Sequence, residues 1–269
     1  MTYFRFLQIF LVSPLILFSV LCLIQYRSEI ITPIAFKTWR LASITLTLVG
    51  IAVVWTTPWD NYLVMTAVWW YDPSLVSGFV IGYVPIEEYI FFVLQTVLTT
   101  LITIFLMRHW PISMAPAGFR PNSSLNKWST IIIGALWLIS TLFLLSGYRS
   151  TTYLTLILSW ALIPIFIQTL FGADILWHYK RLLFWGIVPI TLYLSAADSL
   201  AIFFGTWTIS KEQTLGILLG SILPLEEFIF FLVTNTLVVF GMTLLLAQES
   251  HHRAAEYPLL KRITYTNKN

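Results

Sequence analysis

Two short acidic motifs, each embedded in an apolar run, are the parts of this chain best suited to chemistry. Both motifs read Pro-x-Glu-Glu and are followed, one helical turn later, by two phenylalanines. The motif residues are Pro85, Glu87, Glu88, Phe91 and Phe92 in the first copy, and Pro224, Glu226, Glu227, Phe230 and Phe231 in the second. A carboxylate inside a bilayer is costly unless it is neutral, paired or facing a polar cavity. The glutamate pairs therefore predict a functional site inside a membrane.

Adjacent residues of a helix point about 100° apart, so the two glutamates of a pair face different ways. We expect one glutamate to face a cavity while the other hydrogen-bonds to a neighbouring element. A low dielectric constant disfavours the charged form, and a nearby carboxylate disfavours a second ionisation. At least one glutamate of each pair is therefore expected to be a neutral acid that can donate a proton. Alternatively, the glutamates only clasp other helices and the phenylalanines only fill the core.

Composition independently indicates an integral membrane protein. The chain has 269 residues, of which 58% are hydrophobic and only 10% charged, and its mean hydropathy is +0.83. The net charge of +3 does not indicate nucleic-acid binding, because Lys and Arg cluster between apolar segments and at the C-terminus. The one cysteine, Cys22, rules out an intrachain disulfide. The four histidines lie at segment ends or in the tail, so we expect no metal site.

Hydropathy predicts an all-α integral membrane protein with seven transmembrane helices. The N-terminal apolar segment is interpreted as a retained first helix and not as a cleaved signal peptide. The third segment is longer than a bilayer requires, and Pro85 is expected to kink or tilt it. Residues 59–71 are interpreted as a short helical continuation or an interfacial helix. The expected helices span residues 3–25, 41–57, 75–107, 129–147, 152–171, 182–204 and 213–247.

The chain also contains an internal repeat that is larger than the acidic motif. Asp60 and Trp69 recur 138 residues later as Asp198 and Trp207, and the Pro-x-Glu-Glu motif recurs after 139 residues. Further upstream, Tyr3 recurs 150 residues later. We expect two parallel three-helix repeats joined by a linker helix. The single membrane domain, 1–269, then divides into a first repeat (3–107), a linker with the fourth helix (108–150), a second repeat (151–247) and a cytoplasmic tail (248–269).

With these features the sequence resembles the membrane-embedded lycopene cyclase family, in its fused two-repeat form. The resemblance rests on the doubled Pro-x-Glu-Glu motif with its phenylalanines, on Trp59-Asp60 upstream of the first motif, and on the three-helix repeat. It covers residues 3–247, nearly the whole chain. The second half departs from the first in having Ala197 before Asp198, where the first half has Trp59.

The resemblance implies a non-redox isomerase, an intramolecular lyase of carotenoid biosynthesis. An acid would protonate each acyclic end of lycopene, the neighbouring alkene would attack the cation, and a base would remove a proton to leave a β-ionone ring. The products would be γ-carotene and β-carotene. The implied acids and bases are Glu87, Glu88, Glu226 and Glu227, assisted by Asp60 and Asp198. The implied substrate-binding residues are Pro85, Phe91, Phe92, Trp59, Trp69, Pro224, Phe230, Phe231 and Trp207.

The resemblance also implies the partners. The substrate would be a carotenoid dissolved in the bilayer, other enzymes of carotenoid biosynthesis are candidate partners, and no nucleic acid is involved. Soluble-type lycopene cyclases bind a flavin on a dinucleotide-binding fold. No G-x-G-x-x-G motif follows a strand in this sequence, so we expect no dinucleotide cofactor.

Several alternatives remain open from the sequence. A hydratase that quenches the same cation with water would use the same residues, and a proton-coupled transporter would also contain repeats and intramembrane carboxylates. A retinal-binding receptor fits less well, because the seventh segment has no lysine for a Schiff base. Asp60 and Asp198 could instead cap helix ends, and Trp69 and Trp207 could belong to an interfacial aromatic belt. The ring type, the number of ends cyclised and the oligomeric state also stay open.

The distribution of basic residues predicts the orientation. With seven helices, one side of the membrane holds only Arg5, Arg149 and Lys211, and the other holds the remaining 12 of the 15 Lys and Arg residues. Lys and Arg near helix ends are retained in the cytoplasm. We therefore expect a multi-pass protein of the plasma or inner membrane with its N-terminus outside and its C-terminus in the cytoplasm. Both acidic motifs would then lie at similar depth, toward the outer face.

Overall fold

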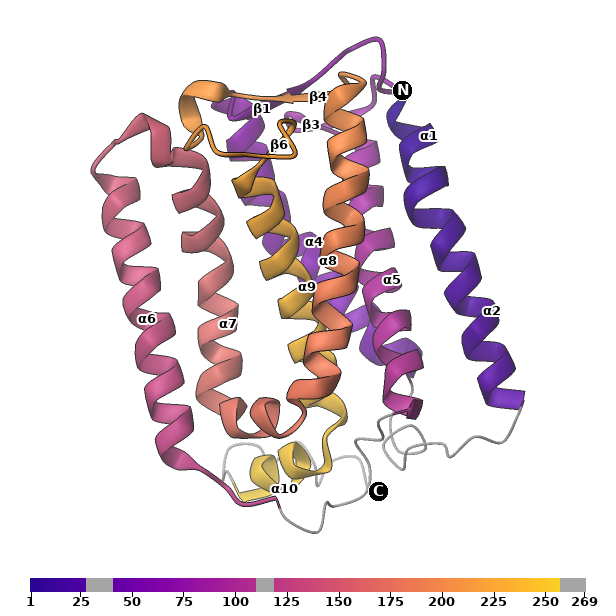
Figure 1. Ribbon diagram of the computed structural model, residues 1–269, viewed down its shortest axis with the longest axis vertical. Helices are drawn as coiled ribbons and strands as arrows, with labels where there is room; N and C mark the ends of the chain where they lie inside the picture. Colours follow the sequence, from indigo (N-terminus) through magenta and orange to yellow (C-terminus); the bar gives the residue numbers. More distant parts are fainter. Residues whose placement is uncertain (28–40, 110–118, 257–269) are drawn as a thin grey trace.

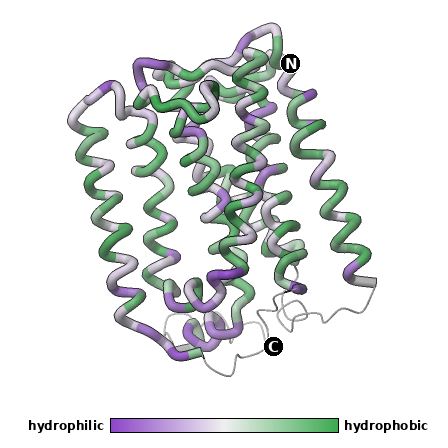
Figure 2. Tube along the Cα trace, viewed as in Figure 1, coloured by the Kyte–Doolittle hydropathy of each residue, from purple (hydrophilic) through white to green (hydrophobic). Residues whose placement is uncertain are grey.

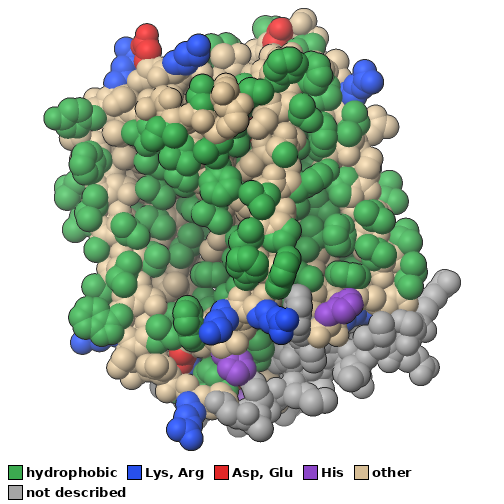
Figure 3. Space-filling view, viewed as in Figure 1, with side chains coloured by type: hydrophobic (Ala, Val, Ile, Leu, Met, Phe, Trp, Pro, Cys, Tyr) green, Lys and Arg blue, Asp and Glu red, His purple; other side chains and the backbone are tan. Residues whose placement is uncertain are grey.

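The computed structural model is a bundle of long helices that run along one common direction (Figure 1). It describes residues 1–27, 41–109 and 119–256, and in these residues seven helices are long and apolar enough to cross a membrane. This finding confirms the predicted all-α membrane fold. Hydrophobic residues dominate the middle of the helices (Figure 2), and Lys and Arg lie at the upper and lower rims of the face drawn in Figure 3.

Two of the spans form the centre of the bundle. In the most apolar 18-residue stretch of each span, 56% of the residues of α5 and 50% of those of α9 are buried, against 11% in the first span, α4 and α6. The helices are α1 (Tyr3–Leu7), the π-helical turn η1 (Gln8–Val12), α2 (Ser13–Arg27), α4 (Leu41–Met65), α5 (Ile86–His109), α6 (Ser123–Leu145), α7 (Thr152–His178), α8 (Lys180–Phe203), α9 (Leu225–Leu246) and α10 (Gln248–Glu256). Two short 3₁₀ turns, Arg149–Thr151 and Lys211–Gln213, lie in the connections.

Two connecting loops, from α4 to α5 and from α8 to α9, cover the end of the bundle near the N-terminus (Figure 1). The loops pair with each other through β1 and β4, an antiparallel pair in which Tyr71 lies opposite Trp207. Each loop then forms a small hairpin, β2 with β3 in the first and β5 with β6 in the second. The strands are β1 (Trp69–Tyr71), β2 (Val80–Ile81), β3 (Val84–Pro85), β4 (Trp207–Ile209), β5 (Leu218–Leu219) and β6 (Leu223–Pro224).

The predicted starts of the third and seventh helices, at residues 75 and 213, are wrong. The helix α5 begins only at Ile86 and α9 only at Leu225, so both glutamate pairs lie in a first helical turn. Pro85 lies in β3 and kinks no helix. The segment before it is apolar, which suggested a helix. However, Gly78 and Gly82 have φ angles of +83° and +70°, which reverse the backbone into a hairpin.

The second predicted helix is longer than expected. Instead of ending near residue 57, α4 continues through Pro58 to Met65, which confirms the interpretation of this segment as a helical continuation. The interpretation fails for residues 66–71, because residues 66–68 form a turn and Trp69–Tyr71 form β1. Together with the late start of α5, this leaves residues 66–85 as a folded loop, and residues 204–224 form the corresponding loop of the second half.

The two central helices are connected by hydrogen bonds between polar side chains. The Gln95 Nε2 atom donates to Thr234 Oγ1 at 3.0 Å, and Thr99 Oγ1 donates to Asn235 Oδ1 at 2.9 Å. The Asn235 Nδ2 atom in turn lies 3.2 Å from Thr191 Oγ1 on α8. Buried polar side chains of membrane helices are commonly paired across helices in this way. These contacts fix α5, α8 and α9 relative to one another.

At the opposite end, α10 is held by a buried ion pair. The Arg253 guanidinium donates to both carboxylate oxygens of Asp174 on α7, at 2.8 and 2.7 Å, and also to the Phe171 carbonyl at 2.6 Å. The Asp174 side chain is only 2% exposed, and it also accepts from the backbone of Asn122 at 3.0 Å. A bidentate Arg–carboxylate contact is both strong and geometrically specific. This network therefore connects α10, α7 and the start of α6.

The ion pair yields a prediction for stability. Asp174→Ala leaves the Arg253 charge without its carboxylate, and we expect it to lower the free energy of unfolding by about 3 kcal/mol. Glu212→Ala is the matched control, because the Arg149–Glu212 pair has side chains 72% and 71% exposed. Its loss should change stability by less than about 1 kcal/mol. Denaturant unfolding in detergent micelles measures the free energy of unfolding of both variants. If Asp174→Ala and Glu212→Ala lower it equally, the buried ion pair does not stabilise the protein more than the exposed one.

Candidate active site

Each glutamate pair divides its two side chains between different tasks. Glu87 and Glu226 are completely buried and bind the loops. The Glu87 Oε1 atom accepts from the backbone N–H of Ser77 at 2.6 Å, and Glu226 Oε1 accepts from that of Leu215 at 2.7 Å. Glu88 and Glu227 instead line an internal cavity. The expectation that adjacent glutamates face different ways is therefore confirmed in both motifs.

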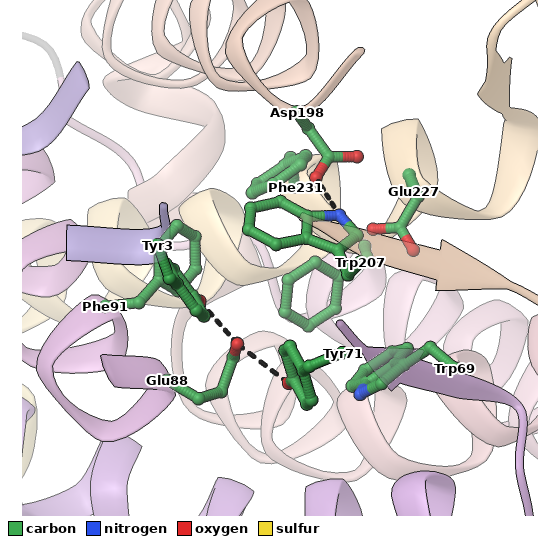
Figure 4. A pocket seen from close by; sticks show the side chains of 10 residues that line it. Tyr3, Trp69, Tyr71, Glu88, Phe91, Asp198, Trp207, Glu227 and Phe231 are labelled. Atoms are coloured by element: carbon green, nitrogen blue, oxygen red, sulfur yellow. Dashed lines mark hydrogen bonds between the residues drawn. The ribbon is translucent and has the colours of Figure 1, made fainter. Parts of the chain in front are cut away.

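The cavity lies under the β1–β4 pair, among residues from α1, α5, α8 and α9 (Figure 4). Its volume is about 30 Å³, which accommodates about one or two water molecules. Its walls combine aromatic rings with three carboxyl groups, and no Lys or Arg is among the residues that line it. The lining residues are Tyr3, Trp69, Tyr71, Glu88, Phe91, Asp198, Trp207, Glu227, Phe230 and Phe231.

Glu88 is held by two tyrosine hydroxyl groups. The Tyr3 hydroxyl, on α1, donates to Glu88 Oε2 in a short hydrogen bond, and the Tyr71 hydroxyl, on β1, donates to the same oxygen at 2.9 Å. Desolvation and the neighbouring Glu88 raise the pKa of the Tyr71 hydroxyl well above its usual value. This hydroxyl therefore keeps its proton over the physiological range and remains a hydrogen-bond donor to the carboxylate form of Glu88.

Glu227 has a single tyrosine partner in the described residues. The Tyr153 hydroxyl on α7 donates to Glu227 Oε1 at 2.7 Å. Tyr153 is completely buried, as is Glu226 beside this site, so solvent does not replace this contact. Tyr71 lies opposite Trp207 in the strand pair, and Trp207 makes its hydrogen bond to a different carboxyl group. The hydrogen-bond environments of Glu88 and Glu227 are therefore unequal.

The two aspartates complete a cluster of four carboxyl groups. Asp198 accepts from Trp207 Nε1 at 3.0 Å and lies within electrostatic range of Glu227 and Glu88. Asp60 is completely buried and interacts electrostatically with Glu88. Among the described residues, neither oxygen of Asp60 has a hydrogen-bond partner. Four carboxyl groups this close in a low dielectric cannot all be ionised together, so the cluster can both store and release protons.

Aromatic rings surround the carboxyl groups. The indole of Trp207 packs against Tyr3 and Phe6 at ring-centroid distances of 4.9 and 5.0 Å. On the other side of the cavity, the Trp59 ring stacks on Phe230 at 5.7 Å with an interplanar angle of 5°. Aromatic faces attract cations, by about 0.5–2 kcal/mol for each ring. The cavity therefore offers a proton donor, a proton acceptor and aromatic faces that would stabilise a cation.

The structure brings most of the predicted site residues together, but not all of them. Trp69 and Trp207 line the cavity, so neither is merely part of an interfacial belt. Trp59 lies behind Phe230, and Phe92 lines a second, larger cavity nearby. The prolines of the motifs, Pro85 and Pro224, are buried in the hairpins and line neither of these two cavities.

Three tyrosines of the site were not identified from the sequence. Tyr3 and Tyr153 recur at an offset of 150 residues, and this signal could have marked them. Tyr71 has no such signal, because its counterpart at an offset of 138 is Ile209. The predicted repeat matches Tyr3 with Tyr153, but only the packing of α1 against α5 and of α7 against α9 places their hydroxyl groups on Glu88 and Glu227.

These features define a multi-pass membrane protein with buried carboxyl groups around an aromatic cavity. No protein-family model and no solved structure matches the chain. Among curated proteins, it is 37% identical to a lycopene beta-cyclase of Halobacterium salinarum over 204 residues, which are 73% of this chain and 79% of the relative. It is also 35% identical to a bifunctional lycopene cyclase/phytoene synthase of Phycomyces blakesleeanus, over 71% of this chain but only 32% of that relative. The chain belongs to the lycopene cyclase family.

The loop contacts of the glutamates yield a second prediction. Glu226→Leu removes the acceptor for the Leu215 N–H, and we expect it to destabilise the protein by about 1–3 kcal/mol. Glu226→Gln keeps an acceptor oxygen at the same place and should retain most of the stability. Thermal unfolding and limited proteolysis of the 204–224 loop distinguish the two variants. If Glu226→Gln is as unstable as Glu226→Leu, the loop contact is not the source of the effect.

Proposed function

We propose that this protein is a lycopene β-cyclase that converts the acyclic ends of lycopene into β-ionone rings. The observation that carries the proposal is the pairing of Glu88 and Glu227 across one aromatic cavity, each held by a tyrosine hydroxyl. Membership of the lycopene cyclase family supplies the substrate class, because the relatives are named for lycopene. The substrate would reach the site from the bilayer, and the reaction requires no flavin.

The reaction is an isomerisation, so the protein must supply a proton and take one back. A carboxylic acid adds its proton to the terminal double bond of an acyclic end and leaves a tertiary cation. The neighbouring double bond attacks this cation and closes a six-membered ring, which moves the positive charge into the ring. A carboxylate then removes a ring proton and leaves a new double bond. The enzyme ends with the same number of protons as it began with, and no electrons are exchanged.

The unequal partners of the two glutamates suggest their roles. Two hydroxyl donors on one oxygen of Glu88 stabilise its carboxylate form, which suits it to act as the base. Glu227 accepts from one hydroxyl group only, so its carboxylate form is stabilised less than that of Glu88, which suits it to act as the acid. Asp198 and Asp60 would assist by sharing protons within the cluster. General acid–base catalysis of this kind contributes about 10²–10⁴-fold in rate.

The aromatic walls would stabilise the cation between these two steps. Trp69, Trp207 and Phe231 present rings to the cavity from different elements, and this supports their assignment as substrate-binding residues. We assign Glu87 and Glu226 a positioning role, since each binds a loop amide. The prolines would act in the same way, by starting each helix with its glutamates in the first turn. Negative charge is favoured at this position by the helix dipole.

The rival functions differ in what they predict. A hydratase would give hydroxylated carotenoids, and a transporter would move protons across liposomes in a substrate-dependent way. The names of the relatives favour cyclisation over both alternatives. Expression in a lycopene-accumulating host, followed by chromatography of the pigments, tests the proposal directly. Formation of γ-carotene and β-carotene is expected, and unchanged lycopene would refute the proposal.

The glutamate variants test the assigned roles. We expect Glu88→Gln and Glu227→Gln to lower cyclisation by about 10²–10⁴-fold, because glutamine neither donates nor accepts the proton. Glu87→Gln and Glu226→Gln are the matched controls and should remain within about tenfold of the wild-type rate, since they keep the loop contact.

Deuterium exchange separates acid from base. In D₂O, the Glu88→Gln variant should still transfer a deuteron from Glu227 to lycopene, and water then removes a different proton from the cation, so that a small amount of deuterium-labelled product accumulates. The Glu227→Gln variant should give no labelled product. Label that appears only with Glu227→Gln would reverse the two roles. Near-wild-type cyclisation by both variants would remove these glutamates from the mechanism.

We also propose an orientation with the cavity toward the outer face of a plasma or inner membrane. Lys127, Lys180 and Arg181 lie at the starts of α6 and α8, at the end of the bundle opposite the cavity. Basic residues near helix ends are retained in the cytoplasm. Reporter fusions after Lys127 and at the C-terminus should therefore report the cytoplasm, and a fusion after Arg149 should report the outside. If the fusions after Lys127 and Arg149 report the same side, the orientation and the crossing of α6 are both wrong.

A further inference from the structure

A second cavity, much larger than the carboxyl cavity, lies between α4, α5, α7 and α9. Its volume is about 390 Å³, within the range of about 300–1,000 Å³ that is typical of ligand pockets. On α4 it is lined by Leu48, Ile51, Ala52, Trp55 and Thr56, which share one face of the helix. Residues of α7 from 160 to 168 line it with the same spacing. We call this cavity the α4–α7 groove.

The groove is open to the bilayer and runs along the helices. Ile51 and Ile167, on its two walls, are 58% and 60% exposed, and no charged residue is among those that line it. The lining of α4 extends from Leu48 to Thr56, which at about 1.5 Å per residue is about 12 Å. At the lower end, Leu48 lies close to the backbone of Gly241. A neutral, elongated hydrocarbon therefore fits the groove, and a charged lipid headgroup does not.

At its upper end the groove meets the carboxyl cavity. Phe230 lines both spaces, so its ring forms the partition between them. The ring is stacked on Trp59 at 5.7 Å and on Trp160 at 6.3 Å. A cavity of 30 Å³ is too small for a ring-forming end group, so the aromatic partition must move before such a group can contact the glutamates.

Two tryptophans hold the walls of the groove together just below this partition. The Trp59 Nε1 atom on α4 donates to the Leu156 carbonyl on α7 at 3.0 Å, and Trp160 Nε1 on α7 donates to the Trp55 carbonyl on α4 at 3.1 Å. The two indoles stack on each other at 4.5 Å. These reciprocal contacts connect α4 to α7 near the cavity, while the helices remain apart below it.

The corresponding side of the second half is packed differently. By the offset of 138 residues, Leu48 of α4 corresponds to Gly186 of α8. A Cβ atom at Gly186 would lie 3.1 Å from Val239 on α9, so α8 packs closely against the central helices here. In the same region Asn235 of α9 bonds to Thr191 of α8. The carboxyl groups are shared by both halves, whereas the groove lies on the α4–α7 side.

We propose that the α4–α7 groove binds the part of the conjugated chain of lycopene next to the reacting end, and that both ends of the substrate reach the carboxyl cavity past Phe230 in two separate binding events. This inference rests on the proposed cyclase function and adds to it the route and the order of the reaction. The flat faces of Trp55, Trp160 and Phe230 suit a flat polyene. Because a chain held in the groove presents one end at Phe230, the monocyclic product must leave, turn end for end and bind again before its second end reacts.

The test measures binding independently of turnover. In a Glu227→Gln background, the purified protein should retain lycopene, and the pigment retained for each protein is read by visible absorbance. Ala52→Trp fills the groove from α4, and Ile167→Trp fills it from α7. Each is expected to lower retention by about tenfold, because overfilling an apolar site weakens binding. In the otherwise wild-type enzyme, both changes should also raise the ratio of γ-carotene to β-carotene.

Each variant has a control on the same helix. Ala42→Trp lies on α4 and Leu170→Trp on α7, and both positions are exposed without lining the groove. These controls should retain lycopene as the background protein does. Equal retention in all four variants, or equal loss in all four, would overturn the groove proposal even if the enzyme cyclises lycopene. A wild-type enzyme that binds lycopene through the groove but never cyclises it would instead refute the proposed function.

Discussion

The burial of six carboxyl groups at one end of a membrane-embedded bundle, those of the four motif glutamates and of Asp60 and Asp198, is the constraint on which the rest of the structure depends. An ionisable group in this environment needs a hydrogen-bond partner or a shared proton. Glu87 obtains its partner from a loop amide and Glu88 from two tyrosines. The loops must therefore fold back over the helix starts, and α1 must pack where Tyr3 reaches Glu88. The strand pair that covers the cavity follows from the same requirement, because β1 carries Tyr71.

The two halves of the site satisfy this constraint unequally, which suits a reaction that needs both an acid and a base. Two chemically identical carboxyl groups can differ in function only if their surroundings differ. Here the difference comes from Tyr71, which adds a second donor to Glu88, and from Trp207, which donates to Asp198. Because β1 and β4 are paired, Tyr71 and Trp207 lie opposite each other. The β1–β4 pair therefore supplies hydrogen-bond donors to carboxyl groups of both halves of the cluster.

The same strand pair and the central helices separate the carboxyl cavity from the α4–α7 groove, which we propose as the binding site of the substrate chain. The carboxyl groups lie in a small cavity, whereas the α4–α7 groove beside it is large and almost entirely apolar. Between them stand the stacked rings of Trp59, Trp160 and Phe230. In the proposed reaction, access to the carboxyl cavity through the apolar α4–α7 groove would keep water away from the carotenoid cation. This arrangement also explains why the acids sit in the first helical turn, where one side faces the covering loops and the other faces the core.

The sequence by itself determined the membrane fold, the seven helices and the residues of the acidic motifs. Hydropathy is a local property of the chain, so the helices could be predicted without the structure. The acidic motifs could also be identified, because a carboxyl group is conspicuous in an apolar run. The sequence did not determine where α5 and α9 begin, since glycine turns interrupt an apolar stretch without changing its hydropathy. Helical geometry predicted that Glu87 and Glu88 divide their tasks, but the sequence did not show which of them binds the loop and which lines the cavity.

Only the tertiary structure decided which partners meet these carboxyl groups. The hydroxyl groups of Tyr3 and Tyr71 are 85 and 17 residues from Glu88 in the chain, and they converge through helix packing and strand pairing. The groove likewise depends on how far α4 stands from α7, a distance set by Trp59 and Trp160 acting across the interface. These contacts join residues on different helices and strands, and no repeating pattern in the sequence relates one partner to the other. The sequence therefore specifies the reactive groups, while their charge states, partners and access from the bilayer are set by packing between distant segments.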